Sequence, residues 1–164
     1  MDSGPSLRPP RHRVSRRAIA YWSARAGVGW LVLLGIEAGW WLIDGGNTTA
    51  HVAGLGVTAV LAVAHVLAMP QWRYRVHRWE TTPEAVYTQS GWFNQERRIA
   101  PVSRIQTVDS ERGLIERMFG LANVTVTTAS AAGPLKIEGL DHDTVLRLVD
   151  DLTTNTQAHP GDAT

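Results

Sequence analysis

Two long apolar stretches near the start of the chain divide it into parts with different patterns. Ala26–Ile43 contains one charged residue, Glu37, and Ala50–Met69 contains none. At the helical rise of about 1.5 Å per residue they would span roughly 27 Å and 30 Å, close to the thickness of a hydrocarbon core. Neither shows the periodicity of a half-buried helix. The pattern predicts two transmembrane helices within residues 25–70, at about 26–43 and 50–69.

The connection between the two stretches and the charges around them predict an antiparallel hairpin with a defined orientation. The connection, Asp44–Thr49, is short and rich in turn-forming residues. Arginines lie before the first stretch and after the second, and none lies in the connection: Arg8, Arg11, Arg13, Arg16, Arg17, Arg25, Arg73, Arg75 and Arg78. By the positive-inside rule, we expect both termini in the cytoplasm. Aromatic residues at the ends are typical of interfacial belts: Tyr21, Trp22, Trp40, Trp41, Trp72 and Tyr74.

Two other interpretations of these stretches are open from the sequence. The first is a cleaved signal peptide followed by one anchor, although the charged leader is long for a signal peptide and no small-x-small cleavage site follows Ile43. The second is a pair of buried helices in a soluble protein. The aromatic ends and the absence of charge between Gly45 and Trp72 argue against it. We therefore expect two spans.

Residues 1–24 form a basic leader, and Pro5, Pro9 and Pro10 predict that it is largely disordered. Its arginines are explained by membrane topology and by attraction to anionic lipids of the inner leaflet. A nucleic-acid-binding arm is the alternative, but no folded reader lies beside it and the net charge of the chain is only +1. We therefore expect no nucleic-acid partner.

Three residues in the first apolar stretch are candidates for helix packing or partner contact: Gly35, Glu37 and Gly39. Glu37 lies roughly 9 Å inside the outer end, a depth at which an ionisable group is expected to face protein or water. The glycines form a G-x-x-x-G pair, about 200° around the helix from Glu37. If they seat the second helix, Glu37 points toward a partner chain; the alternative is a protonated Glu37 with only a packing role.

From residue 73 the pattern changes to short strand-like runs separated by turn signals. The runs are 74–80, 85–89, 92–99, 102–109, 124–127 and 135–138, with a helical turn at 114–119. Asp141 is an N-cap candidate, and apolar residues at helical spacing predict an amphipathic helix over 141–154: Val145, Leu148, Val149 and Leu152. The prediction is an α+β domain over residues 73–155, followed by a disordered tail over 156–164.

Several stretches of this region match the motifs of a known family: Trp72–Val76, Ser90–Trp92, Arg98–Pro101, Arg104–Gln106 and, most specifically, Gly113–Ala122. Over about residues 72–152 the chain resembles the membrane-associated bacterial pleckstrin-homology-like (PH-like) domain of the YdbS type. The resemblance implies a PH-like β-sandwich or barrel of about seven strands, capped by a C-terminal helix. A two-helix anchor would hold it at the inner face of the bacterial plasma membrane. It also implies a binding or assembly role beside larger membrane proteins, and it carries over no catalytic residues.

The composition excludes several kinds of chemistry. With no cysteine, the chain has no disulfide framework, thiolate metal site or cysteine nucleophile. It contains no G-x-S-x-G motif, phosphate-binding glycine loop or i,i+4 histidine pair. His51 and His65 would lie roughly 21 Å apart along one helix, too far to share a metal ion. We therefore expect a non-enzymatic protein with no catalytic, cofactor or metal site.

Two binding functions are favoured, and an enzyme with a polar site in the β-domain is the less favoured alternative. The first is engagement of a partner membrane protein, or of a second copy in a homo-oligomer, in addition to the lipid bilayer. The alternative is an anionic lipid-headgroup module that uses Arg97, Arg98 and Arg104. A purely structural role competes for these arginines, since adjacent residues on one strand face opposite sides of a sheet.

Overall fold

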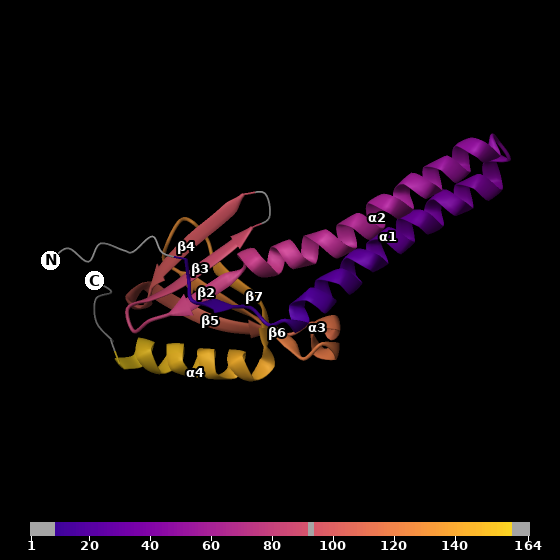
Figure 1. Cartoon of the computed structure of the whole chain (residues 1–164). Helices are drawn as coiled ribbons and strands as arrows, with labels where there is room; N and C mark the ends of the chain where they lie inside the picture. Colours follow the sequence, from indigo (N-terminus) through magenta and orange to yellow (C-terminus); the bar gives the residue numbers. More distant parts are fainter. Residues whose placement is uncertain (1–8, 92–93, 159–164) are drawn as a thin grey trace.

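The computed structural model describes residues 9–91 and 94–158, and it consists of a long helical hairpin joined to a β-domain (Figure 1). Helix α1 runs from Arg17 to Asp44 and helix α2 from Thr48 to Val76. Gly45, with φ of 57°, ends α1 in the left-handed conformation that glycine adopts most readily. Asn47 caps α2, because its Oδ1 accepts the backbone N–H of Thr49 at 3.0 Å. The predicted antiparallel hairpin is therefore confirmed.

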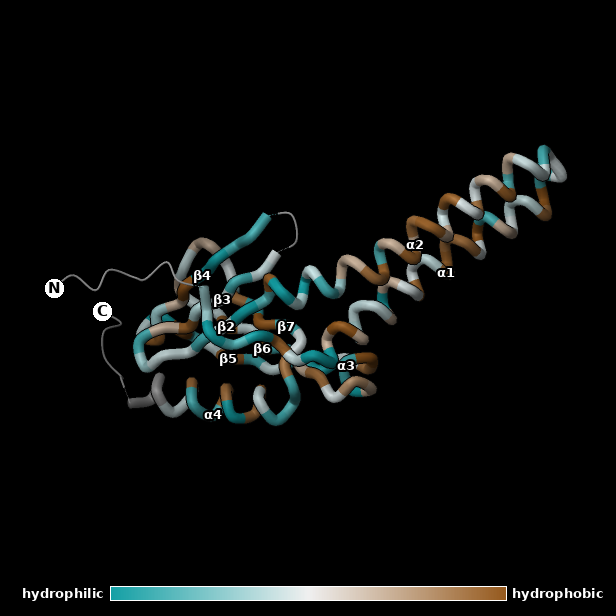
Figure 2. The backbone as a smooth tube through the Cα atoms, in the orientation of Figure 1, coloured by the Kyte–Doolittle hydropathy of each residue, from teal (hydrophilic) through white to brown (hydrophobic). Residues whose placement is uncertain are grey.

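The hairpin is apolar and exposed over most of its length. Both helices are long and apolar enough to cross a membrane. Of the apolar 18-residue stretch in each helix, 0% is buried inside the protein in α1 and 6% in α2. Figure 2 shows hydrophobic residues along both helices where they project from the β-domain. Leu42 and Val60, for example, are 85% and 69% exposed. A surface of this kind requires a lipid environment, which excludes the interpretation as buried core helices.

The β-domain contains two antiparallel sheets, ordered β1-β2-β3-β4 and β5-β6-β7. The strands are β1 His12–Arg13, β2 Arg78–Thr81, β3 Ala85–Gly91, β4 Gln95–Pro101, β5 Ile105–Glu111, β6 Leu121–Thr128 and β7 Leu135–Asp141. A 3-10 turn, Val102–Arg104, carries the chain from one sheet to the other, and the short helix α3, Leu114–Met118, joins β5 to β6. Helix α4, His142–Ala158, closes the domain. The predicted PH-like sandwich of about seven strands with a C-terminal helix is confirmed.

Helix α4 covers the core with the apolar face that its spacing predicts. Val145, Leu148 and Leu152 are at most 3% exposed, and they pack in one cluster with residues of the second sheet such as Leu121. Fully burying a side chain of this size is worth about 1.5–3 kcal/mol. The Asp141 carboxylate accepts a hydrogen bond from Ser15 Oγ at 2.8 Å, so the start of α4 is tied to the segment before α1.

Some predicted boundaries were wrong. The run over 74–80 is not one strand, because α2 continues to Val76 and β2 begins at Arg78. Continuation of the helix buries Val76 and lets the His77 N–H donate to the Arg73 carbonyl at 2.9 Å. The run over 102–109 begins with the 3-10 turn. The imperfect alternation that follows reflects a register shift between Ile105 and Thr107.

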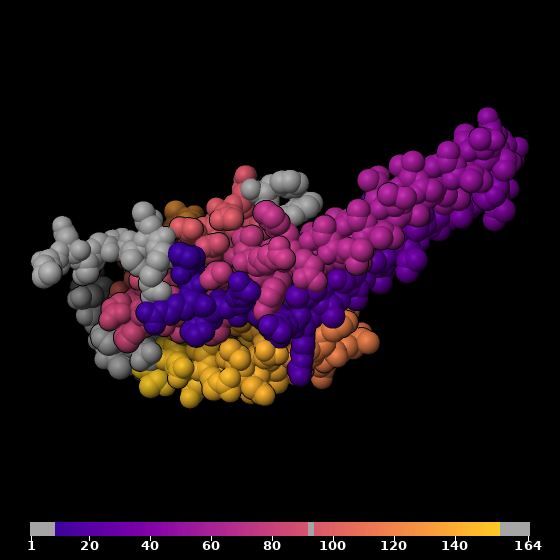
Figure 3. All heavy atoms as spheres, in the orientation of Figure 1, coloured from indigo at the N-terminus to yellow at the C-terminus, as the bar shows by residue number. Residues whose placement is uncertain are grey.

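The largest correction concerns the leader, of which residues 1–8 lie outside the described residues. From residue 9 onward it is part of the fold. Strand β1 pairs with β2, with His12 opposite Trp79, and α1 begins nine residues earlier than the apolar span. Figure 3 shows this N-terminal segment lying across the β-domain surface next to α4. The leader thus supplies one of the seven strands, although the sequence predicts all of them within residues 73–155.

The leader is ordered because its apolar side chains complete the core. Val14, Ala18 and Trp22 are 5%, 0% and 2% exposed and belong to the same core cluster as α4. Local composition shows arginine and proline here, and only the fold shows where the intervening apolar residues pack. At the other end of the domain α4 extends to Ala158, so the first residues of the predicted tail are helical. The rest, 159–164, lies outside the described residues.

The close packing of α1 against β7 predicts the effect of a single substitution. A Cβ atom at Gly139 of β7 would lie 2.9 Å from the Ala18 Cβ, so no free volume remains beside Ala18. Ala18→Leu should therefore lower the free energy of unfolding by about 1–3 kcal/mol through overpacking. Ala20→Leu, at an exposed position of the same helix, should be nearly neutral. Urea unfolding of the full chain in detergent micelles measures both; equal stabilities would contradict this docking.

Candidate functional site: a cavity at the foot of the hairpin

The C-terminal end of α2 and the two sheets line an open cavity of about 490 Å³. Three of its residues recur every fourth position on α2, and therefore on one helix face, and the C-cap residue of α2 continues the spacing: His65, Met69, Arg73 and His77. Ser90 and Gly91 at the end of β3 and Lys136 and Glu138 of β7 form the other walls. The cavity therefore lies where the membrane hairpin meets both sheets of the β-domain.

Arg73 joins three elements at this cavity. Its Nη2 donates to Glu138 Oε2 of β7 at 2.5 Å, and its Nε donates to His77 Nε2 at 3.4 Å. Its guanidinium carbon lies 4.4 Å from the ring centroid of Trp22 in α1, a cation–π distance. The sequence analysis interpreted Arg73 only as part of the topology signal. The structure makes it the link between both helices of the hairpin and the second sheet.

His77 is the buried titratable group of the site, with 7% of the residue exposed. Its Nδ1 donates to the Arg73 carbonyl oxygen at 2.9 Å, and its ring lies 5.4 Å from that of Trp22. Because Nε2 accepts from Arg73, these partners favour the neutral tautomer protonated at Nδ1. Burial, followed by the positive charge of Arg73, lowers the pKa of His77 below its ordinary value.

The arrangement is suited to holding an anionic group. Arg73 is partly neutralised by Glu138, whereas Lys136 is exposed at the wall of the cavity. Both ring nitrogens of His77 are occupied by hydrogen bonds, so His77 is not set up as a general base for a neighbouring hydroxyl. Within residues 9–91 and 94–158, no three His, Asp or Glu side chains are grouped to hold a metal ion.

The structure reverses the expected arrangement of the intramembrane candidates. Glu37 faces the second helix of the hairpin, where its Oε1 accepts a hydrogen bond from Thr58 Oγ1 at 2.7 Å. Its Oε2 is buried without a hydrogen-bond partner among the described residues. A Cβ added at Gly35 or Gly39 would meet nothing within 4 Å, so the glycines do not seat α2. The condition of that prediction, glycines that seat α2, is therefore not met, and the carboxyl group of Glu37 lies against Thr58 inside the hairpin.

The three candidate headgroup arginines do not form one site. Arg98 donates to the carbonyl oxygens of Pro134 at 2.6 Å, of Gly133 at 2.8 Å and of Ala132, so it holds the turn between β6 and β7. Arg97 and Arg98 line a small surface cavity of about 290 Å³ near this turn, whereas Arg104 does not line it. The structural role that competed for these residues therefore describes Arg98.

Two of the aromatic residues expected at the membrane interface are buried in the protein instead. Tyr21 and Trp22 are 7% and 2% exposed. The Tyr21 hydroxyl donates to Glu116 Oε1 at 2.8 Å, and Trp22 lies beneath Arg73. They therefore dock α1 onto the β-domain, while Trp40 and Trp72 are 62% and 51% exposed, as residues of an aromatic belt would be.

Sequence reasoning missed the cavity because its residues come from separated parts of the chain. The spacing of four between His65, Met69, Arg73 and His77 was the available signal for one wall. That signal depends on α2 continuing past the apolar span. Lys136 and Glu138 lie on a strand that was predicted, but nothing local indicated that this strand packs against α2.

The lowered pKa of His77 predicts how stability depends on pH. Since the folded pKa lies below the unfolded one, the contribution of neutral His77 is present above about pH 6.5 and is lost as pH falls through the folded pKa. His77→Asn keeps a side-chain N–H near the Arg73 carbonyl and removes the titration. Thermal unfolding of the full chain between about pH 7 and pH 5 should therefore depend less on pH in this variant than in the wild type. Identical pH profiles would contradict the buried neutral histidine.

The comparisons with known proteins agree with this architecture. The family model described as "Bacterial PH domain" matches residues 27–156, which include most of the hairpin as well as the β-domain. The chain is 30% identical over 92 residues to the UPF0699 transmembrane protein YdbS of Bacillus subtilis (strain 168). That alignment covers 56% of the chain and 57% of the relative, so the chain spans little more than half of the relative's length. No solved structure matches the chain.

Proposed function

The chain belongs to the bacterial PH domain family, and from this premise we propose that it is a non-enzymatic module that engages a partner membrane protein. It is a membrane-associated protein, with two helices of membrane-spanning length and a relative named as a transmembrane protein. We further propose that the hairpin crosses the bacterial plasma membrane twice, with both termini in the cytoplasm. The arginines on both sides of the hairpin and their absence from the Asp44–Thr49 connection support this orientation.

The uncovered glycine face of α1 is the observation that carries the partner proposal. Glu37 is turned toward α2 by its hydrogen bond to Thr58, and Gly35 and Gly39 lie about 160° away on the other side of α1. Open space surrounds both glycines. In lipid, helices associate through close packing at small residues, so this face can receive a further helix from a partner or from a second copy.

The β-domain offers a second place for assembly. Strand β4 is the last strand of its sheet, and five of its seven residues are exposed. An exposed edge of this kind can accept a strand from another chain. A module that is held in the membrane and presents an exposed strand edge is suited to bringing proteins together, which supports an assembly role.

Photo-crosslinking in native membranes tests the partner proposal. A photoreactive amino acid at Ile43, which is 84% exposed, should yield a crosslinked product of higher mass. Gly35→Leu together with Gly39→Leu should remove most of it, because the added side chains prevent close approach. Gly54→Leu, at an equally open position of α2, is the matched control and should leave the product unchanged.

The mass of the product distinguishes a second copy from a different membrane protein. Both results support engagement through the glycine face. Absence of any crosslinked product from the wild type, or a product that survives the double leucine substitution, would reject this face as the contact.

The cavity at the foot of α2 favours a second candidate function, binding of an anionic lipid headgroup. Arg73 and Lys136 line it, and Met69, the last residue of the predicted span, forms part of its wall. A phosphate group at the inner surface could therefore reach both cations while its acyl chains stay in the bilayer. This location differs from the arginines selected in the sequence, of which Arg98 is engaged by backbone carbonyls.

Lipid retention tests the second candidate. Lys136→Gln should lower the anionic lipid that remains with the detergent-purified full chain by about fivefold, as expected for one cation worth about 1 kcal/mol. Arg104→Gln removes an exposed arginine outside the cavity and should have little effect. Native mass spectrometry measures the bound lipid. Equal losses in the two variants would indicate nonspecific charge attraction rather than a headgroup site.

A further inference from the structure

Helix α3 carries an exposed apolar surface that neither proposed function uses. Leu114, Ile115 and Met118 are 76%, 45% and 79% exposed. Among the described residues after residue 78, five large hydrophobic side chains are exposed, and three of the five lie on α3. Figure 2 shows hydrophobic residues along the chain at α3. This concentration on a single short helix requires an apolar environment of its own.

The position of α3 indicates what that environment is. The helix lies beside the start of α1, at the end of the β-domain from which the hairpin leaves (Figure 1). Glu116 of α3 accepts the Tyr21 hydroxyl at 2.8 Å, and the Phe119 ring lies 6.1 Å from that of Tyr21. Tyr21 precedes Ala26, the first residue of the apolar span, by only about 7.5 Å along the helix axis.

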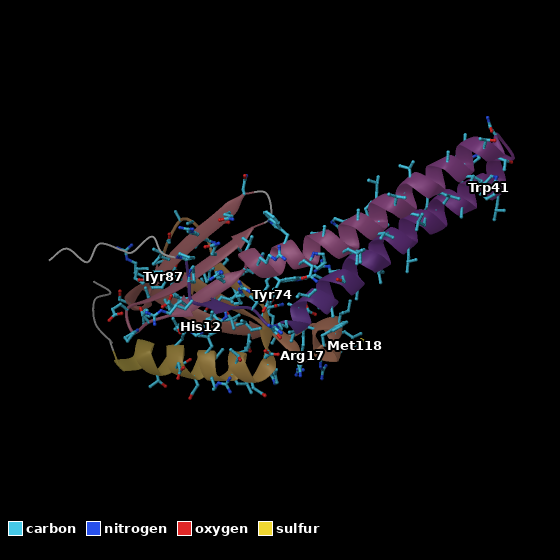
Figure 4. The ribbon with its side chains drawn as sticks, in the orientation of Figure 1. His12, Arg17, Trp41, Tyr74, Tyr87 and Met118 are labelled. Carbon is cyan, nitrogen blue, oxygen red and sulfur yellow. The ribbon has the colours of Figure 1, made fainter. Side chains whose placement is uncertain are left out.

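This depth corresponds to the interfacial layer of a bilayer. The headgroup regions add roughly 5–7.5 Å on each side of a hydrocarbon core of about 30 Å, so Tyr21 lies within their outer part. Because α3 is fixed beside Tyr21, it lies at this level whenever the hairpin occupies the membrane. Figure 4 shows Met118 on the hairpin side of the domain, next to Arg17 and opposite the end that carries Tyr87.

The charges around α3 also fit a membrane surface. Arginines gather near it from three parts of the chain: Arg17, Arg25, Arg112 and Arg117. Arg17 approaches Gly120 closely, and Arg112 donates to the Leu121 carbonyl at 3.1 Å, so both lie at the C-terminal side of α3. The acid of the helix, Glu116, is turned to Tyr21 in α1. An apolar centre with a basic rim is typical of segments that rest in an anionic interface.

We propose that α3 inserts Leu114, Ile115 and Met118 into the cytoplasmic leaflet of the membrane that the hairpin crosses. The protein then has three membrane contacts, two spanning helices and one interfacial helix, and these define a plane. The third contact prevents the β-domain from tilting about the hairpin and holds the cavity at the foot of α2 against the bilayer surface. This inference rests on the proposed membrane orientation and is independent of any partner or headgroup.

Depth measurement on the full chain tests the proposal. Since the chain has no cysteine, a single Met118→Cys substitution can carry a nitroxide without further changes, at a position too exposed to disturb folding. The labelled protein is reconstituted in vesicles of phosphatidylcholine and phosphatidylglycerol. Collision rates are then measured with oxygen, which concentrates in the bilayer, and with a water-soluble nickel chelate.

Two further labelled positions provide the controls. Leu61→Cys, 54% exposed on α2, reports the inserted hairpin, and Ile99→Cys, 50% exposed on β4, reports the domain surface away from the membrane. The ratio of oxygen to nickel collisions at position 118 should shift well above that at position 99, toward the value at position 61. Leu114→Ser and Ile115→Ser together should reduce this shift while the ratio at position 61 stays high.

Each other outcome overturns the proposal in a recognisable way. A ratio at position 118 equal to that at position 99 would place α3 in water. An immobilised nitroxide shielded from both reagents would show that a protein covers α3. A low ratio at position 61 would instead show that the hairpin itself is not inserted, and the membrane orientation would fail together with this inference.

Discussion

Arg73 stands where the hairpin meets the β-domain, and the relation between the two parts depends on its contacts. The guanidinium pairs with Glu138 of β7, lies over Trp22 of α1 and donates to His77 at the end of its own helix. Its side chain is only 29% exposed, so these interactions are partly shielded from water. The last turns of α2 are therefore packed against the domain and do not form a flexible linker.

This junction makes the hairpin and the domain a single folded unit. The segment before α1 supplies strand β1 and the buried residues Val14 and Ala18, and Trp22 continues the same core. A fragment that began at residue 73 would lack all of these and would expose the surface that they cover. The match of the family model to residues 27–156 likewise extends over both parts. The structural domain therefore begins before the membrane span and not after it.

Three surfaces of this folded unit are left uncovered, and they lie at different places along it. Gly35 and Gly39 of α1 face away from α2. The cavity beside Lys136 lies at the C-terminal end of α2, and α3 lies beside the start of α1. In the proposed membrane orientation, these three surfaces would face lipid, the membrane surface or another membrane protein.

The sequence by itself determined the elements whose signal is local. Hydropathy alone predicts the two long apolar helices, because a stretch of about 20 residues with at most one charge has few stable environments other than lipid. Alternating β-branched residues defined β6, and the spacing of Val145, Leu148 and Leu152 defined α4, since each pattern reflects burial of one face.

Only the tertiary structure decided which of these elements meet. The leader contains arginines and prolines that are typical of a disordered segment, and its order depends on β2 and β7 some sixty or more residues later. Glu37 faces Thr58, and Arg98 holds the turn near Pro134, because the fold brings distant donors and acceptors together. Burial without a partner is costly for polar groups, so these long-range pairings, which no local pattern records, determine where each charged side chain points.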